Sequence, residues 1–287
     1  MINIFNKEVK SYFRSSAGYI FLVVFLLLAG ALFSLTNLMP GNGFYTDTLF
    51  SFVFIFLFLT PILTMRTICS ETKEKTDQLL LTSPLKIWHI VLGKFFAASS
   101  IFILAVVVTF LFPIILSKFG KIPTGEIIGA YIGFILIGMS FISIGIFISS
   151  LTDNQVVAAI GTFGALFIIW IAEWISSALP TSVNSGLIFA TILVFIISFL
   201  VYRNIKNKYV ALGISIFGIL TMVFIYFKDK TLYEGLLVKC FQWFSLIKRY
   251  ESFNMGVLSL NSIVYYITFC ATFLFLTIQI ISRRRWN

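Results

Sequence analysis

Eight long apolar stretches constrain this chain more than any other feature of its sequence. Each holds about 20 residues, the length that an α-helix needs to cross roughly 30 Å of hydrocarbon. The stretches are 18–38, 49–66, 95–117, 127–150, 156–178, 186–202, 209–227 and 261–282. Charged residues make up only 11% of the chain, far below the usual share in soluble domains. The sequence therefore predicts an all-α polytopic membrane protein of about eight transmembrane helices, with residues 1–287 as a single transmembrane domain.

The distribution of Lys and Arg predicts which ends of the spans face the cytoplasm. If the N-terminus is cytoplasmic, 14 of the 21 basic residues fall on the inner side and seven on the outer side. The short loop 203–208 and the terminal basic run 283–285 independently give the same orientation under the positive-inside rule. Both termini are therefore predicted to be cytoplasmic. Because the net charge of +10 is spread over these short loops, we do not expect nucleic-acid binding.

Two polar segments outside the spans show helical periodicity. The segment 1–16 is typical of a helix lying in the cytoplasmic interface of the membrane, with a frayed basic tail as the alternative. Its apolar positions are Ile2, Phe5, Val9 and Phe13. The segment 228–260 is too long for a simple turn. Its apolar residues recur at three- and four-residue steps. They predict a short amphipathic helix on, or dipping into, the outer leaflet, with a plain surface helix as the alternative.

The longest charged loop, residues 66–94, lies between the second and third spans. Charged residues fill its first half, a leucine run follows, and Ser83-Pro84 comes next. Proline does not continue a helix, so we expect a short charged helix that ends before Pro84. A second amphipathic helix is expected from Ile87. Such a protrusion can transmit a push from a soluble partner into the spans on both sides; an ordinary solvated loop is the alternative.

Several chemistries are poorly supported by this sequence. The phosphate-binding motif GxxxxGK[ST] is missing, since Gly93-Lys94 has Trp88 in place of the first glycine and Phe95 in place of Ser or Thr. The chain is therefore not expected to hydrolyse ATP or to be an enzyme. A single histidine and three well-separated cysteines predict neither a metal site nor a disulfide framework. We expect no cofactor in this chain.

Two features within the spans are candidates for function or packing. Glu173 lies near the outer end of the fifth span, between Trp170 and Trp174. An ionisable residue at such a position is a candidate for substrate contact or gating, although its nearness to the headgroups is the plainer explanation. The fourth and fifth spans are rich in glycine, alanine and serine. Small residues of this kind predict close helix packing, with a substrate-facing role as the alternative.

The stretch from Met65 to Ala97 resembles the signature of ABC-2 type permeases, the membrane subunits of ATP-binding cassette exporters. That signature has an acidic residue, a basic pair, Gly-Thr, an acidic residue, a leucine run, Thr-x-Pro and Gly-Lys. The matching residues here are Glu71, Lys73, Thr76, Leu79, Leu80, Leu81, Thr82, Ser83, Pro84, Gly93 and Lys94. The chain departs from the pattern at Lys75, where the family usually has glycine, and at Gln78, where glutamate is usual.

Two further segments share the resemblance. In the turn before the fifth span, Thr152 and Gln155 have capping-box spacing and Asp153 places negative charge near the helix N-terminus. A structural cap is the simple explanation; in the resembled family this turn also lies near the ATPase. The C-terminus resembles a branch described as gliding-motility or copper-maturation permeases. Its matching residues are Phe253, Gly256, Val257, Tyr265, Tyr266, 273–277, Arg284, Arg285 and Trp286. Many relatives have six spans, so residues 186–227 look like an extra hairpin.

The resemblance implies a permease subunit in the bacterial cytoplasmic membrane that exports a substrate. Its implied partners are an ABC ATPase subunit that binds ATP and Mg²⁺, a second permease copy or paralogue, and an accessory membrane subunit, all within or beside the lipid bilayer. It implies ATPase-coupling roles for Glu71, Lys73, Thr76, Gln78, Leu79, Leu80, Ser83, Pro84, Thr152, Asp153 and Gln155. The alternatives are an ion-gradient-driven secondary transporter and a non-transporting membrane anchor. Secondary transporters usually carry charges near the membrane midplane, and this sequence has none there.

Overall fold

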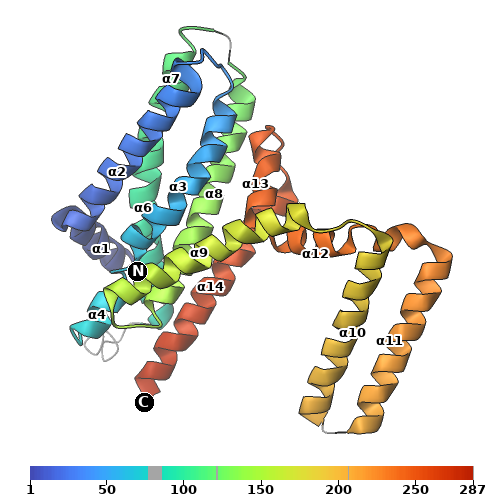
Figure 1. The fold of residues 1–287 in the computed structure, drawn as a ribbon. Helices are drawn as coiled ribbons and strands as arrows, with labels where there is room; N and C mark the ends of the chain where they lie inside the picture. The colour runs from blue at the N-terminus through green and yellow to red at the C-terminus, as the bar shows by residue number, and fades with distance from the viewer. Residues whose placement is uncertain (77–85, 121, 206, 287) are drawn as a thin grey trace. The chain divides into compact units, whose positions relative to one another are not determined.

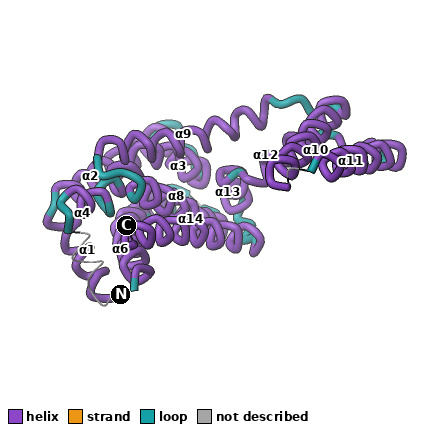
Figure 2. Tube along the Cα trace, turned by 90° about the horizontal axis from the view of Figure 1, so that it is seen from below, coloured by secondary structure: helices purple, strands orange, loops and turns teal. Residues whose placement is uncertain are grey.

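The computed structural model describes residues 1–76, 86–120, 122–205 and 207–286, and these residues contain helices and loops but no strand. Figure 2 shows long helices joined by short loops. The main helices are α1 (Ile2–Arg14), α2 (Ser16–Phe33), α3 (Tyr45–Thr64), α4 (Cys69–Lys73), α6 (Ile87–Thr109), α7 (Leu111–Leu116), α8 (Thr124–Ser149), α9 (Gln155–Ala178), α10 (Val183–Ile205), α11 (Lys208–Lys228), α12 (Leu236–Phe244), α13 (Leu246–Asn254) and α14 (Leu260–Trp286). A π-helical turn, η1 (Ser34–Leu38), extends α2, and a 3₁₀ turn, η2 (Lys230–Tyr233), precedes α12.

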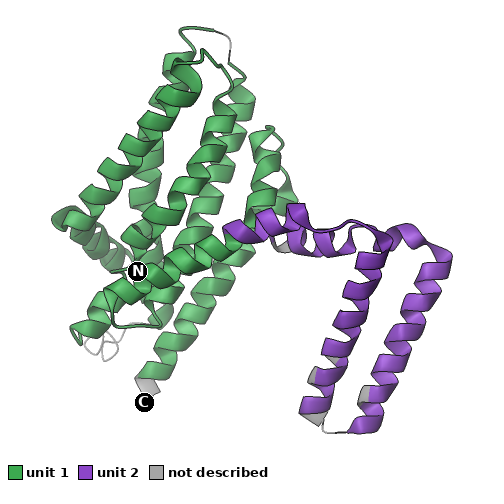
Figure 3. Ribbon diagram, viewed as in Figure 1, with its two compact units in different colours: residues 1–169, 246–287 green, residues 170–245 purple. Residues whose placement is uncertain are grey.

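Eight helical stretches of the described chain are long and apolar enough to cross a membrane. They coincide with the eight apolar stretches of the sequence, so the prediction of an all-α polytopic membrane protein is confirmed. The chain divides into two compact units, coloured separately in Figure 3. The first unit comprises Met1–Ile169 and Leu246–Asn287, and the second comprises Trp170–Ser245.

The first unit is built around α8, which packs against α3 on one side and α14 on another (Figure 1). Small residues of α8 let its neighbouring helices approach closely, because a side chain on them would collide with a neighbour. A Cβ on Gly133 would lie 2.6 Å from the Phe253 Cβ, and one on Gly138 would lie 2.5 Å from the Phe102 ring. The predicted packing role of the small residues in the fourth span is therefore confirmed.

Aromatic rings fill the centre of the first unit. The Phe56 ring centroid lies 5.2 Å from that of Phe102 and 4.8 Å from that of Phe134. Phe25 of α2 adds an edge-to-face contact with Phe102. Aromatic pairs at these separations stabilise a core beyond the area that they bury. The cluster joins α2, α3, α6 and α8 around one shared core.

The N-terminal segment forms the predicted helix, so the frayed tail is excluded. α1 packs along α6 and buries Ile4, Glu8 and Tyr12. Tyr12 donates a hydrogen bond of 2.9 Å to the Leu63 carbonyl, and burial raises the pKa of its phenol above the ordinary value. The predicted apolar stripe lies on another face, since Ile2 and Phe13 remain exposed. That stripe is free to contact lipid, and its place at the membrane interface stays a prediction.

The charged loop begins with the short helix α4, as predicted. Residues 77–85, which hold the leucine run and Pro84, lie outside the described residues. The predicted helix from Ile87 is confirmed, and it leads directly into the third span, because α6 runs without a break from Ile87 to Thr109. No proline interrupts this stretch, so the helix continues directly into the third span. Gly93 lies in its first half, where a Cβ would be 2.9 Å from Ile4 of α1.

The outer segment 228–260 is helical, but the single amphipathic helix predicted there is wrong. It consists of η2, α12 and α13. Gly235 takes a left-handed conformation with φ of 63° before α12, and Ser245 is extended between α12 and α13. α12 belongs to the second unit and α13 to the first. α13 buries Leu246, Ile247, Tyr250 and Phe253, and its proximity to the outer leaflet stays a prediction.

The second unit consists of the end of α9, the α10–α11 hairpin, η2 and α12. The hairpin corresponds to the extra pair of spans predicted from residues 186–227. Ser215 donates a hydrogen bond of 2.8 Å to Ser198 across the hairpin, and Gly218 faces Val194. Tyr233 of η2 donates to the Met222 carbonyl at 2.9 Å. Hydroxyl pairs and small residues are usual contacts between membrane helices.

The contact of Gly133 with Phe253 leads to a stability prediction. We expect Gly133→Ala to lower the free energy of unfolding by about 1–3 kcal/mol, because the new methyl group overpacks the α8–α13 contact. The matched control is Gly164→Ala in α9, where no atom lies within 4 Å of the added Cβ. That substitution should be neutral or stabilising by about 0.5–1 kcal/mol, since alanine favours the helix. Thermal unfolding of the purified chain measures both, and equal effects would contradict the packing assignment.

Candidate functional site

A buried lysine lies beneath the charged loop. Lys94 is in α6, and its side chain is only 2% exposed. Its Nζ lies 3.0 Å from Glu8 Oε1 of α1 and 2.9 Å from Glu71 Oε1 of α4. The ammonium also donates a hydrogen bond of 2.7 Å to the Thr67 carbonyl. Burying an unpaired ammonium is very unfavourable, so these three acceptors are what permit Lys94 to be there.

The charges of this cluster are balanced by a fourth group. Lys7 Nζ lies 3.8 Å from Glu71 Oε1, and its side chain is largely exposed. The two lysines and the two glutamates therefore sum to zero formal charge. The exposed Lys7 pair is screened by water, whereas the Lys94 pairs are largely buried and are screened less. We call Glu8, Glu71 and Lys94 the junction cluster, since it joins α1, α4 and α6 at one point.

α4 is also attached to α8 and α14. The Ile68 and Cys69 amides both donate to Ser149 Oγ at 3.2 Å, at the end of α8. Arg284 of α14 donates from Nη1 to Thr72 Oγ1 at 2.9 Å and from Nη2 to the Ser150 carbonyl at 2.7 Å. α4 is therefore connected to α8 and α14 as well as to α1 and α6.

The C-terminus of α4 explains a departure of the sequence from the family signature. Lys75 has φ of 55°, a left-handed conformation that glycine adopts without strain. The Lys75 amide donates to the Thr72 carbonyl at 3.2 Å, and the Thr76 amide donates to the Glu71 carbonyl at 3.0 Å. These two bonds form a Schellman motif, which usually has glycine at the position of Lys75. Lys75 thus occupies a turn position that glycine would favour.

The turn between α8 and α9 is capped differently from the prediction. α9 begins at Gln155, so its first capping position is Asn154, and Asn154 Oδ1 accepts from the Val156 amide at 2.9 Å. Thr152 Oγ1 accepts from the Asn154 amide at 3.1 Å. The predicted Thr152–Gln155 capping box is therefore wrong, because Gln155 is already the first helical residue. Asp153 is exposed at this turn.

A polar pocket of about 410 Å³ brings several predicted residues together. Its walls come from α1, from the segment 66–76 and from the start of α9. Among the predicted coupling residues, Glu71, Thr76 and Gln155 line it, together with Arg66 and the junction cluster. Lys73 is exposed on α4, outside this lining. The remaining predicted coupling residues of the loop, Gln78, Leu79, Leu80, Ser83 and Pro84, lie outside the described residues.

Glu173, the predicted gating residue, lies in the second unit. Its Oε2 accepts a hydrogen bond from Ser245 Oγ at the C-terminus of α12. The carboxylate therefore links the end of α9 to α12 within that unit. This contact gives Glu173 a structural role, and its part in substrate contact or gating stays a prediction.

Sequence reasoning did not identify Glu8, Ser149 or Arg284 as partners of α4. One signal could have found Glu8, since it is the only acidic residue before Asp47 and lies on a helix beside a lysine at the edge of an apolar run. Ser149 and Arg284 gave no comparable signal, because their partners are backbone amides, a hydroxyl and a carbonyl.

The junction cluster predicts a strong response to loss of the lysine. Lys94→Met should lower the free energy of unfolding by about 3–5 kcal/mol, because it leaves two carboxylates without their buried counter-ion. The combined variant Glu8→Gln, Glu71→Gln and Lys94→Met should recover most of this loss. Lys73→Met, at an exposed position of α4, is the control and should change thermal unfolding little. Failure of the combined variant to recover stability would contradict the charge-pairing explanation.

The left-handed backbone at Lys75 predicts a substitution that stabilises the fold. Lys75→Gly should raise the free energy of unfolding by about 1–2 kcal/mol, since it removes a side chain from a left-handed backbone position. Lys73→Gly, within α4, should instead lower it by about 1 kcal/mol. Hydrogen–deuterium exchange of the 69–76 amides measures both changes locally, and slower exchange in Lys73→Gly than in Lys75→Gly would contradict the assigned turn.

In the comparison with known families, one family model matches more than half of the chain. The family model described as "ABC-2 family transporter protein" matches residues 2–175. This range contains α1, α4, α6 and the turn before α9, and thus the junction cluster and the polar pocket. No curated protein matches the chain.

Proposed function

The chain belongs to the ABC-2 family of transporter proteins, and from that premise we propose that it is the membrane subunit of an exporter driven by a separate ATPase. The family and the eight apolar helices make it a multi-pass membrane protein and a permease component of an ABC transporter. The ATPase partner, the export direction and the bacterial cytoplasmic membrane are parts of the proposal. A second permease copy or a paralogue would complete the membrane part of the transporter.

The observation that carries the proposal is the attachment of α4 to four other helices. Its contacts through Glu71, Ser149 and Arg284 reach α1, α6, α8 and α14. α4 is short and begins the charged loop, so these contacts hold it against the neighbouring helices. A partner that moves the loop therefore moves the ends of several membrane spans together. This is the property that a coupling element between an ATPase and a permease requires.

The charge distribution supports the side on which this partner would bind. The proposed topology places the loop 66–94, the turn 151–155 and both termini on the side that holds 14 of the 21 basic residues. ATP is present only in the cytoplasm, so a coupling loop has to be on this side. The polar pocket is formed where the loop and the turn meet, with Glu71, Thr76 and Gln155 in its wall. We propose that the ATPase docks over this pocket and over the residues that follow Thr76.

The state of Lys94 supports an energy source outside the chain. Gly93-Lys94 is the part of the sequence most similar to a phosphate-binding loop, yet it lies within the continuous helix α6. The Lys94 ammonium is buried and paired with two carboxylates, so it does not face a phosphate group. Energy would therefore come from nucleotide bound to the partner. Mg²⁺ would be bound there as well.

The exposed helices of the chain fit an assembly within the bilayer. Most of the surface of α10 and of α11 is exposed and apolar. Apolar helix faces of this kind contact lipid or another membrane helix. We propose that they are available to lipid, to a second permease copy or to an accessory membrane subunit.

The docking proposal is tested with one substitution in the loop. Leu80→Asp should abolish copurification of the ATPase, because a carboxylate replaces an apolar contact of the leucine run, while membrane insertion is unchanged. The matched control is Phe119→Asp, an exposed aromatic residue on the predicted outer side. Phe119→Asp should leave copurification as in the wild type. Normal recovery of the ATPase with Leu80→Asp would overturn docking at this loop.

A further inference from the structure

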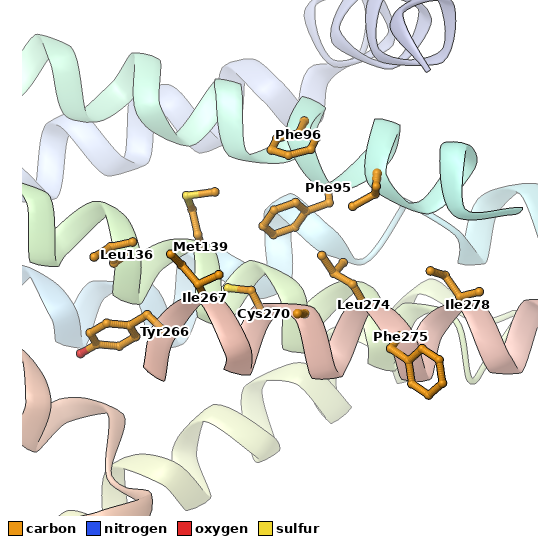
Figure 4. A pocket seen from close by; sticks show the side chains of 12 residues that line it. Phe95, Phe96, Leu136, Met139, Tyr266, Ile267, Cys270, Leu274, Phe275 and Ile278 are labelled. Carbon is orange, nitrogen blue, oxygen red and sulfur yellow. The ribbon is translucent and has the colours of Figure 1, made fainter. Parts of the chain in front are cut away.

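An apolar groove runs along α14 in the first unit, and neither the family nor the proposed coupling assigns it a role. Figure 4 shows its wall, in which Ile267, Cys270, Leu274 and Ile278 follow one another along α14. Phe95 and Phe96 of α6, with Leu136 and Met139 of α8, form the remainder. The groove has a volume of about 390 Å³.

The dimensions of the groove decide what fits it. The lining of α14 extends from Tyr266 to Ile278, which corresponds to about 18 Å at the rise of an α-helix. This length is close to the roughly 15 Å of hydrocarbon in one leaflet. A hydrocarbon chain of one leaflet therefore matches the groove in length.

The chemistry of the wall also favours a hydrocarbon chain. Its two polar groups already have partners within the chain. The Tyr266 hydroxyl donates to the Leu246 carbonyl at 2.6 Å, and the Cys270 thiol lies 3.5 Å from Ser140 Oγ. A ligand with polar groups inside the groove would leave them without hydrogen bonds, which is unfavourable in an apolar site. The occupant is therefore hydrocarbon along its whole length.

One end of the groove has the character of a membrane interface. Trp88 lies one helical turn before Leu92 on α6 and is 43% exposed. Lys86 precedes α6, Arg283 lies near the end of α14, and both side chains are exposed. Tryptophan and basic residues are typical of the level of the lipid headgroups. Basic residues at that level attract anionic lipids, and the proposed topology places this end in the cytoplasmic leaflet.

We propose that this groove binds one acyl chain of an anionic phospholipid, with the headgroup phosphate at Lys86 and Arg283. The bound chain lies between α6 and α14 and fills the space beside α8. The site is independent of the ATPase, so it would remain if the proposed coupling were wrong.

The first experiment fills the groove. The purified chain is reconstituted with equal amounts of palmitoyl-oleoyl phosphatidylglycerol and the matching phosphatidylcholine, re-extracted in detergent and examined for retained lipid by native mass spectrometry. The wild type should retain one phospholipid per chain, and Ala271→Trp should lose it, because the indole occupies the groove. Thr272→Trp, the neighbouring exposed position outside the groove, is the matched control and should retain the lipid. Equal retention by the two variants, or none by the wild type, would overturn the proposal.

A second variant and a headgroup test keep the result interpretable. Should Ala271→Trp not migrate as a single species in size-exclusion chromatography, Ile267→Trp blocks the groove from its other end. Lys86→Gln with Arg283→Gln should lower the retained ratio of phosphatidylglycerol to phosphatidylcholine several-fold. Lys118→Gln with Lys228→Gln removes equal charge on the predicted outer side and should leave the ratio unchanged. A ratio that the first pair does not alter would overturn the assignment of the headgroup.

Discussion

The pairing of one buried ammonium with two carboxylates is the interaction on which the junction of α1, α4 and α6 depends. Lys94 is buried because Glu8 and Glu71 reach it from two other helices. Without these partners the ammonium would have to move to water, and α1 and α4 would lose their common anchor. The contact holds the N-terminal helix and the start of the charged loop against α6, so the geometry of the polar pocket follows from it.

The contacts of α4 also connect the charged loop to several membrane spans. A solvated loop would move independently of the spans that it connects. Here Ser149 holds the start of α4 to α8, and Arg284 holds Thr72 of α4 to α14. The contacts are made at the ends of long helices whose packing depends on small residues of α8, such as Gly133 and Gly138. Closely packed helices move as rigid elements, so a local displacement at α4 becomes a displacement of helices.

The candidate site was only partly predictable. The family signature pointed to Glu71 and Thr76, and the structure places both in the wall of one pocket, while their coupling role stays a prediction. It did not identify Glu8, which is more than sixty positions away in the chain. Nor did it show that Lys75 would adopt the conformation of the usual glycine, because a side chain is tolerated there at modest energetic cost. The predicted cap of α9 was two residues too early, since Asn154 and not Thr152 accepts from the Val156 amide in the first turn.

The sequence alone determined the fold class, the eight spans and the helical character of the N-terminus, because hydrophobic length and periodicity are local properties and the bilayer admits few structures. It also placed the small residues where helices would meet. Only the tertiary structure decided that the segment 228–260 divides between two units, and that Lys94 meets two carboxylates. These outcomes depend on contacts between residues distant in the chain, and such contacts leave no periodic trace in the sequence.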